Sequence, residues 1–301
     1  MEISCLIVRS YGSTFFVPSL MSTKSMGKVQ TYGNLASYFS KAEPFLFEDE
    51  FKNNLFWELA KVSRTRGNPT WAGNVFLHGK LSISSLITPS GYLLISEGAG
   101  EAIIRLAKYG KAKKWKIKGV TGSQESVGFF IREWLGETGT LPAERKDFMI
   151  YSVPCDQVFK AFSEPTLEVV KPESWPRIQT WTTLFANESS PPVNANALLT
   201  ISREMMKRGN LFLMRKEGVG ACAMGGFGRS TPNSLVINEV FVPKELRGMG
   251  YGSELISGLI GEARRRKVSK CILFSDFFGP KNLYERLGFE KVVPFCEQAL
   301  G

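Results

Sequence analysis

Histidine, paired cysteines and long apolar runs are the scarce features of this chain of 301 residues. The single histidine, His78, ends a strand-like run before Gly79, a setting that favours a structural or exposed side chain over a catalytic one. No apolar run approaches the ~20 residues of a membrane helix, and neither low-complexity segments nor heptad repeats occur. These absences argue against a helical membrane protein, and we expect no membrane partner.

The cysteines are five, an odd number, and no two of them form a CxxC pair. Cys222 and Cys271 lie inside apolar, strand-like runs, as buried thiols do. The pattern favours reduced cysteines in a cytoplasmic protein over a disulfide framework or a zinc site. We therefore expect a cytoplasmic location and no bound metal.

Basic residues outnumber acidic ones, 38 to 28, and the formal net charge is +10. The excess is spread along the chain, with one dense run at Arg264–Lys267. At the end of a helix, such a run complements the negative end of the helix dipole. We therefore expect no specific nucleic-acid partner, although a nucleic-acid-binding protein with a continuous basic stripe remains an alternative.

The length and the 43% hydrophobic composition suit two domains of about 100–200 residues each. The apolar run Ile3–Val8 is too short for a secretory leader, and we interpret residues 1–30 as a poorly ordered extension. Two halves separate near residues 155–166, which predicts domains at 31–155 and 165–301. The sequence leaves the oligomeric state open.

Hydrophobic periodicity predicts a mixed α/β architecture in both halves. In the first half, helices are expected at 49–64, 100–109 and 123–135, and strands at 74–77, 81–88, 92–96, 115–120 and 148–153. In the second half, strands are expected at 167–170, 211–215, 219–226, 235–242, 270–275 and 289–293, and helices at 172–185, 194–208, 250–266 and 280–287.

A glycine-rich turn links the strand that ends at Val242 to the helix that begins near Gly250. The helix carries an apolar stripe at 3.6-residue spacing, from Leu255 to Ala263. A helix N-terminus exposes unpaired amides and a positive dipole end, and glycines let the backbone approach a ligand closely. With Arg247 at its mouth, this turn is suited to bind a diphosphate.

The spacing Arg247-x-x-Gly250-x-Gly252 resembles the R/Q-x-x-G-x-G/A motif of GNAT acetyltransferases, and Leu283–Phe289 follows in that family's order. The resemblance covers Leu167–Phe295 and implies a mixed central sheet flanked by helices, with acetyl-CoA as co-substrate. It also implies that strand residues bind the pantetheine arm and that loop residues hold the pyrophosphate. The cofactor-binding residues so implied are Val240, Phe241, Val242, Arg247, Gly248, Met249, Gly250, Tyr251, Gly252, Ser253 and Asn282.

The resemblance also implies two catalytic residues for acetyl transfer to a primary amine by direct attack in a ternary complex. Tyr284 matches the family's general acid, with core packing as its alternative role. Glu239 is the candidate base, placed by strand alternation on the face of Ile237 and Phe241; a solvated side chain is the alternative, and Asp276 or water is the rival base. The acceptor is a small-molecule or peptide amine. A non-catalytic acyl-CoA-binding sensor or scaffold is the alternative function.

The first half resembles the N-terminal region of a two-part GNAT family at residues 43–54, 86–95 and 119–122. Residues 1–150 contain no R-x-x-G-x-G loop, so we expect a degenerate GNAT-like domain without a second acetyl-CoA site. Two departures stand out in the second half. The segment before Asn282 is shorter than in many relatives, and because the chain ends soon after Phe295 we expect the usual final strand to be short or missing.

Overall fold

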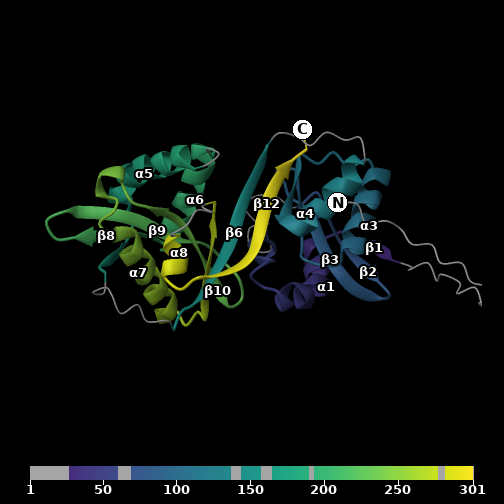
Figure 1. Ribbon diagram of the computed structural model, residues 1–301, viewed down its shortest axis with the longest axis horizontal. Coiled ribbons are helices and arrows are strands. Elements are labelled where there is room, and N and C mark those ends of the chain that lie inside the picture. Colours follow the sequence, from purple (N-terminus) through teal and green to yellow (C-terminus); the bar gives the residue numbers. More distant parts are fainter. Residues whose placement is uncertain are drawn as a thin grey trace, which may run out of the picture.

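The computed structural model describes residues 27–59, 69–136, 144–156, 165–189, 193–276 and 282–300. Within these residues, twelve strands form one continuous sheet (Figure 1). No helix in the described part of the chain is both long enough and apolar enough to cross a membrane.

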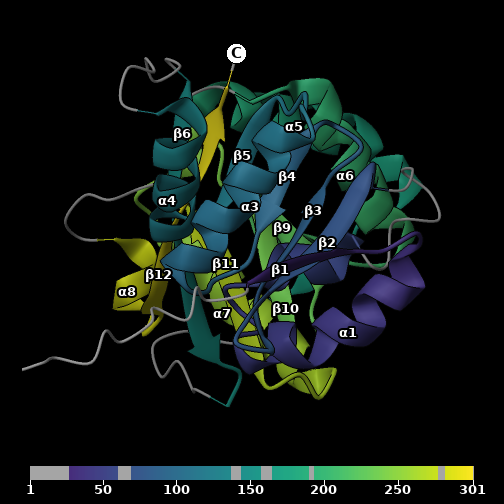
Figure 2. The same ribbon diagram turned by 90° about the vertical axis from the view of Figure 1, so that its right-hand side faces the viewer.

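The first half of the chain supplies six strands and three complete helices. The strands are β1 (Lys28–Thr31), β2 (Trp71–Leu77), β3 (Lys80–Ile87), β4 (Tyr92–Ile95), β5 (Gly119–Ser123) and β6 (Arg145–Pro154). The helices are α1 (Leu35–Glu48), α3 (Gly100–Ala112) and α4 (Gln124–Leu135), and residues 54–59 are also helical. In Figure 2, α3 and α4 lie on one side of the sheet and α1 on the other.

The second half supplies the other six strands. They are β7 (Leu167–Val169), β8 (Leu211–Lys216), β9 (Gly220–Ser230), β10 (Ser234–Phe241), β11 (Lys270–Ser275) and β12 (Glu290–Ala299). The helices are α5 (Trp175–Glu188), α6 (Ala195–Lys207), α7 (Tyr251–Arg265) and the short α8 (Leu283–Arg286). A core that includes Leu255 and Leu259 lies under α7, and a second core, which includes Ile178 and Met205, lies under α5 and α6.

The strand order is symmetric: β1-β2-β3-β4-β5-β12-β6-β11-β10-β9-β8-β7. In each half the fourth and fifth strands pair in parallel, β4 with β5 and β10 with β11, whereas the other pairs are antiparallel. The two halves therefore repeat one topology on either side of a central strand pair. This confirms the predicted mixed α/β sheet with two related halves.

The two central strands are exchanged between the halves. β12, the last strand of the chain, pairs with β5 of the first half from Phe295↔Ser123 to Ala299↔Gly119. β6, the last strand of the first half, pairs with β11 of the second half, and β6 and β12 pair with each other (Figure 1). The expectation of a short or missing final strand is therefore wrong, because β12 finds its partners outside its own half.

Other differences have local causes. Helix α1 was not predicted; it contains Pro44, and Asn34 caps its start by accepting a hydrogen bond from the Ser37 amide. The helix expected at 49–64 begins at residue 54, and its last part lies outside the described residues. β1 begins inside the segment interpreted as an extension, whose residues 1–26 also lie outside the described part. β5 starts at Gly119 rather than Trp115.

Candidate functional site

The loop between β10 and α7 holds two glycines in the left-handed backbone region. The φ angles are +80° at Gly248 and +86° at Gly250. A Cβ built on either glycine meets no protein atom within 4 Å. The glycines are therefore needed for the backbone turn, and they leave the surface of the loop open, as a cradle for a ligand requires.

Helix α7 begins directly after this loop, with Gly250 as its N-cap and no side chain capping it. The first amide of the helix with a backbone partner is that of Glu254, which donates to the Gly250 carbonyl. Among the described residues, the amides of Tyr251, Gly252 and Ser253 have no protein acceptor. Three free amides and the positive dipole end make this point suited to bind an anion.

A pocket of about 590 Å³ opens at this helix end. Its lining consists of Val240, Val242, Leu246, Arg247, Gly248, Gly250, Tyr251, Gly252, Ser253, Leu283, Tyr284 and Arg286. The structure thus brings together nine of the thirteen residues predicted for the site. Four of the predicted residues do not line the pocket: Phe241, Met249, Asn282 and Glu239. Phe241 is buried against α5 and α6, and Met249 is exposed.

Strands β10 and β11 separate beside the pocket. Their parallel register runs from Ser234↔Lys270 to Ile237↔Leu273 and stops there, before β10 ends at Phe241. The later part of β10, which includes Val240 and Phe241, therefore has no ladder partner in β11. An extended ligand that carries amide groups fits such an edge, because it completes the missing backbone hydrogen bonds.

Glu239 lies at a bulge in β10, where its φ angle is +54° and the register with β9 shifts. The bulge breaks the alternation of the strand, so that Ile237 packs in the core under α7 and Phe241 in the core under α5 and α6. The expectation that Glu239 shares one face with both residues is therefore wrong.

The Glu239 carboxyl group is buried, with 1% of the residue exposed. One oxygen accepts a hydrogen bond of 2.7 Å from Ser202 Oγ of α6, and the other has no partner among the described residues. Burial raises the pKa of Glu239 to about 7. The alternative of an ordinary solvated side chain is thus wrong, and the group is set to exchange a proton near neutral pH.

Tyr284 lies in α8, half-buried, with its ring against two other aromatic rings. The ring centroids lie 6.0 Å from Tyr151 and 5.8 Å from Phe289. Burial, assisted by the charge of Asp276, raises the pKa of Tyr284 to about 12. The phenol is therefore protonated at neutral pH. The side chain both packs against these rings and lines the pocket, and its role as general acid stays a prediction.

Asn282 holds α8 in place. Its side-chain oxygen accepts from the Tyr284 amide (2.8 Å), and its Nδ2 donates to the Tyr151 hydroxyl (2.9 Å), which in turn donates to Glu285 (3.2 Å). Tyr151 belongs to the exchanged strand β6, so the first half of the chain supports the tyrosine of the second. Sequence reasoning missed Tyr151, because nothing in the spacing along the chain links it to Tyr284.

Two arginines line the pocket. Arg247 is held at its edge, because Nε donates to the Val242 carbonyl (2.9 Å) and the guanidinium pairs with Glu188 at the end of α5. Arg286 is exposed and was missed; its position two residues after Tyr284 on a one-turn helix was the available signal. The pocket therefore has a second cation for an anionic ligand.

The comparisons with known proteins identify one domain directly. A family model of the acetyltransferase (GNAT) domain matches residues 207–291, from the end of α6 to the start of β12. Among curated proteins, none matches the chain.

Solved structures match the chain over almost its whole length. A GNAT-family acetyltransferase from Colwellia psychrerythraea is 13% identical, with a TM-score of 0.58 over 91% of this chain and 100% of the other. A GCN5-related N-acetyltransferase from Sphaerobacter thermophilus is 15% identical, with a TM-score of 0.59 over 91% and 95%. A tandem GNAT protein from the clavulanic acid biosynthesis pathway is 12% identical, with a TM-score of 0.53 over 91% and 99%. At these identities the likeness concerns the fold, and it confirms two GNAT-like halves.

Proposed function

We propose that this chain, in which residues 207–291 match the acetyltransferase (GNAT) domain and both halves have a GNAT-like fold, transfers an acetyl group from acetyl-CoA to a primary amine. The observation that carries the proposal is one pocket of about 590 Å³ that joins an anion-binding helix end, a diverging strand edge and a protonated tyrosine. The acceptor is a small-molecule or peptide amine.

The residues present fit acetyl-CoA. The free amides at the start of α7 suit the pyrophosphate, with Arg247 and Arg286 as flanking cations. The backbone of Val240–Val242 suits the pantetheine arm, because β10 lacks a ladder partner there. The first half has no R-x-x-G-x-G loop, and its glycines at the start of α3, Gly98 and Gly100, lie against Ser82 and Phe129 rather than open space, so we expect one acetyl-CoA per chain. The buried cysteines of the described residues are free thiols, which supports a cytoplasmic location.

In the proposed reaction, the amine nitrogen attacks the thioester carbonyl carbon directly, and the carbon–sulfur bond then breaks. Glu239 is buried and does not line the pocket, so it receives the proton of the amine through water. Its unpartnered oxygen is the atom that accepts this proton. Tyr284 donates its hydroxyl hydrogen to the departing sulfur. Asp276 remains the rival base, at the end of β11.

The test is calorimetric titration with acetyl-CoA. We expect a stoichiometry near one and a dissociation constant raised at least tenfold by Arg247→Glu, which places a carboxylate beside the phosphate site. Arg265→Glu is the matched control, because Arg265 carries the same charge at the opposite end of α7. Equal affinity of the Arg247 variant and the wild type would refute the assignment of this loop.

A further inference from the structure

Arg229 of β9 is a partly buried arginine whose Nε is buried, and no carboxylate pairs with it among the residues that the structure describes. Its guanidinium lies 4.9 Å from the centre of the Phe274 ring on β11. Its Nε is inaccessible to solvent and has no acceptor, and it makes no ion pair with any residue that the structure describes. A desolvated guanidinium without an anion is costly, and such groups are normally paired.

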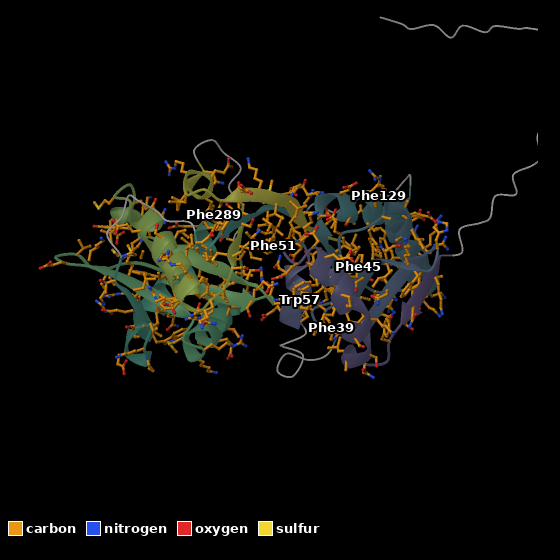
Figure 3. All side chains as sticks on the ribbon, turned by 90° about the horizontal axis from the view of Figure 1, so that it is seen from below. Phe39, Phe45, Phe51, Trp57, Phe129 and Phe289 are labelled. Atoms are coloured by element: carbon orange, nitrogen blue, oxygen red, sulfur yellow. The ribbon has the colours of Figure 1, made fainter. Side chains whose placement is uncertain are left out.

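At the same junction of the two halves, the buried carboxylate of Glu50 does have hydrogen-bond partners. The Glu50 carboxylate accepts from the Asn233 amide (2.9 Å), Asn233 Nδ2 (3.0 Å), Ser234 Oγ (2.9 Å) and the Thr231 hydroxyl. Figure 3 shows its neighbour Phe51 where the halves meet. The junction thus satisfies its buried carboxylate fully and leaves its guanidinium open.

Burial lowers the pKa of Arg229 to about 10, and Glu58, from the helical residues 54–59, opposes that shift only in part. Glu58 contributes through its field, without an ion pair to the guanidinium. The guanidinium therefore has no anion in direct contact among the described residues, and a bound anion would supply one.

The position of Arg229 connects it to the proposed reaction. Arg229 stands opposite Val236 of β10, and Phe274 follows Leu273, the residue at which β10 and β11 separate. Leu273 packs in the core under α7, so Phe274 lies on the other face of the sheet, toward which Glu239 also points. The guanidinium thus lies on the face of the proposed base, next to the opening between the strands.

We propose that Arg229 binds a carboxylate of the acceptor, and that the acceptors are therefore amino acids rather than simple amines. The inference rests on the proposed function and names its substrate class. The Phe274 ring holds one face of the guanidinium, so that its N–H edge is presented to a planar carboxylate, which pairs with it through two parallel hydrogen bonds.

The test compares each of several amino acids with its carboxamide as acceptor, by release of CoA. The wild type should use the acid with a kcat/KM about 100-fold above that of the amide, and Arg229→Gln should reduce this ratio to near one. Arg215→Gln is the matched control, because Arg215 is an exposed arginine on the adjacent strand β8 and should leave the ratio unchanged. Equal use of acid and amide by the wild type would overturn the proposal.

A second variant separates substrate binding from an interface role of Arg229. Glu58→Gln removes a carboxylate whose field reaches the guanidinium, so it should raise kcat/KM for acids and leave that for amides unchanged. If Arg229 served only to hold the halves together through Glu58, this variant would instead lower the melting temperature and leave the ratio unchanged.

A binding measurement distinguishes failure of this proposal from failure of the proposed function. In the presence of CoA, an N-acetyl amino acid should bind more tightly than its N-acetyl amide, and Arg229→Gln should abolish the difference. If acetyl-CoA itself does not bind, the proposed function fails. If acetyl-CoA binds and amines react without any preference for a carboxylate, only the role of Arg229 is refuted.

Discussion

Replacing Tyr284 with phenylalanine removes one hydroxyl group from the pocket and keeps the ring. The contacts with the Tyr151 and Phe289 rings are retained, so folding and acetyl-CoA affinity should change little. An interaction made only in the transition state lowers kcat and kcat/KM together. We therefore expect both to fall in this variant with no change in the dissociation constant of acetyl-CoA.

The size of the decrease follows from the acidity of the phenol. General acid catalysis contributes about 10²–10⁴-fold. The pKa of Tyr284 is about 12, whereas that of an ordinary thiol is about 8.5. Complete proton transfer to a free thiolate is therefore uphill by roughly 5 kcal/mol, and the hydroxyl acts mainly as a hydrogen-bond donor while the carbon–sulfur bond breaks. This places the expected decrease at the lower end, about 100-fold.

The assay is steady-state CoA release on a confirmed acceptor, combined with calorimetry of acetyl-CoA binding. Tyr109→Phe, in α3 of the first half, is the control for the same substitution far from the pocket. Unchanged kcat in Tyr284→Phe would refute the reasoning and leave the tyrosine as a packing residue. Tight acetyl-CoA binding by the wild type without turnover of any amine in a broad panel would favour the sensor or scaffold instead.

Three further predictions concern the loop, the base and the junction. Gly250→Val should abolish acetyl-CoA binding, whereas Gly220→Val, at a similar φ of +83° at the first residue of β9, should lower stability comparably and spare binding. Equal affinity losses would contradict a role in the site. With Glu239 as the base and a pKa of about 7, kcat/KM should rise with pH up to about 7 and then level off, and Glu239→Gln should remove this rise. Because the pKa of Glu239 is higher in the folded state than in the unfolded state, the stability of the wild type falls as the pH rises from about 4.5 to about 7. Above pH 7, urea unfolding should therefore show Glu239→Gln to be more stable than the wild type by up to about 3 kcal/mol. The same pH dependence of stability in both proteins would contradict the raised pKa of Glu239. Glu50→Gln should lower the free energy of unfolding by about 1–3 kcal/mol, because one oxygen of a fully hydrogen-bonded carboxylate becomes a donor, and no loss would show that the junction does not depend on it.

The sequence predicted the parts of the site that depend on local signals. The glycine spacing, the strand before it and the stripe from Leu255 to Ala263 are all encoded within a few turns of chain, and the structure has them where they were expected. The bulge at Glu239 was not predictable from alternation, because a single inserted residue changes the face of those that follow.

The contributions of the first half could not be predicted, because they are nonlocal. Tyr151 reaches Asn282 only through the pairing of β6 with β11, and Arg229 lies over Phe274 only because the sheet places β9 near β11. No periodicity in one sequence specifies which strands become neighbours when they are far apart along the chain.

The exchange of β6 and β12 has a consequence for how this protein is made. During synthesis the first half emerges early, yet β5 lacks its neighbour until residues 290–299 leave the ribosome. Until then β5 presents an open edge, which is a template for pairing with other chains. A chain truncated after residue 155, or one that starts at residue 165, would retain such an edge permanently, because each lacks the strand that the other half supplies. We therefore expect the two halves to unfold in one cooperative transition and neither half to fold stably by itself.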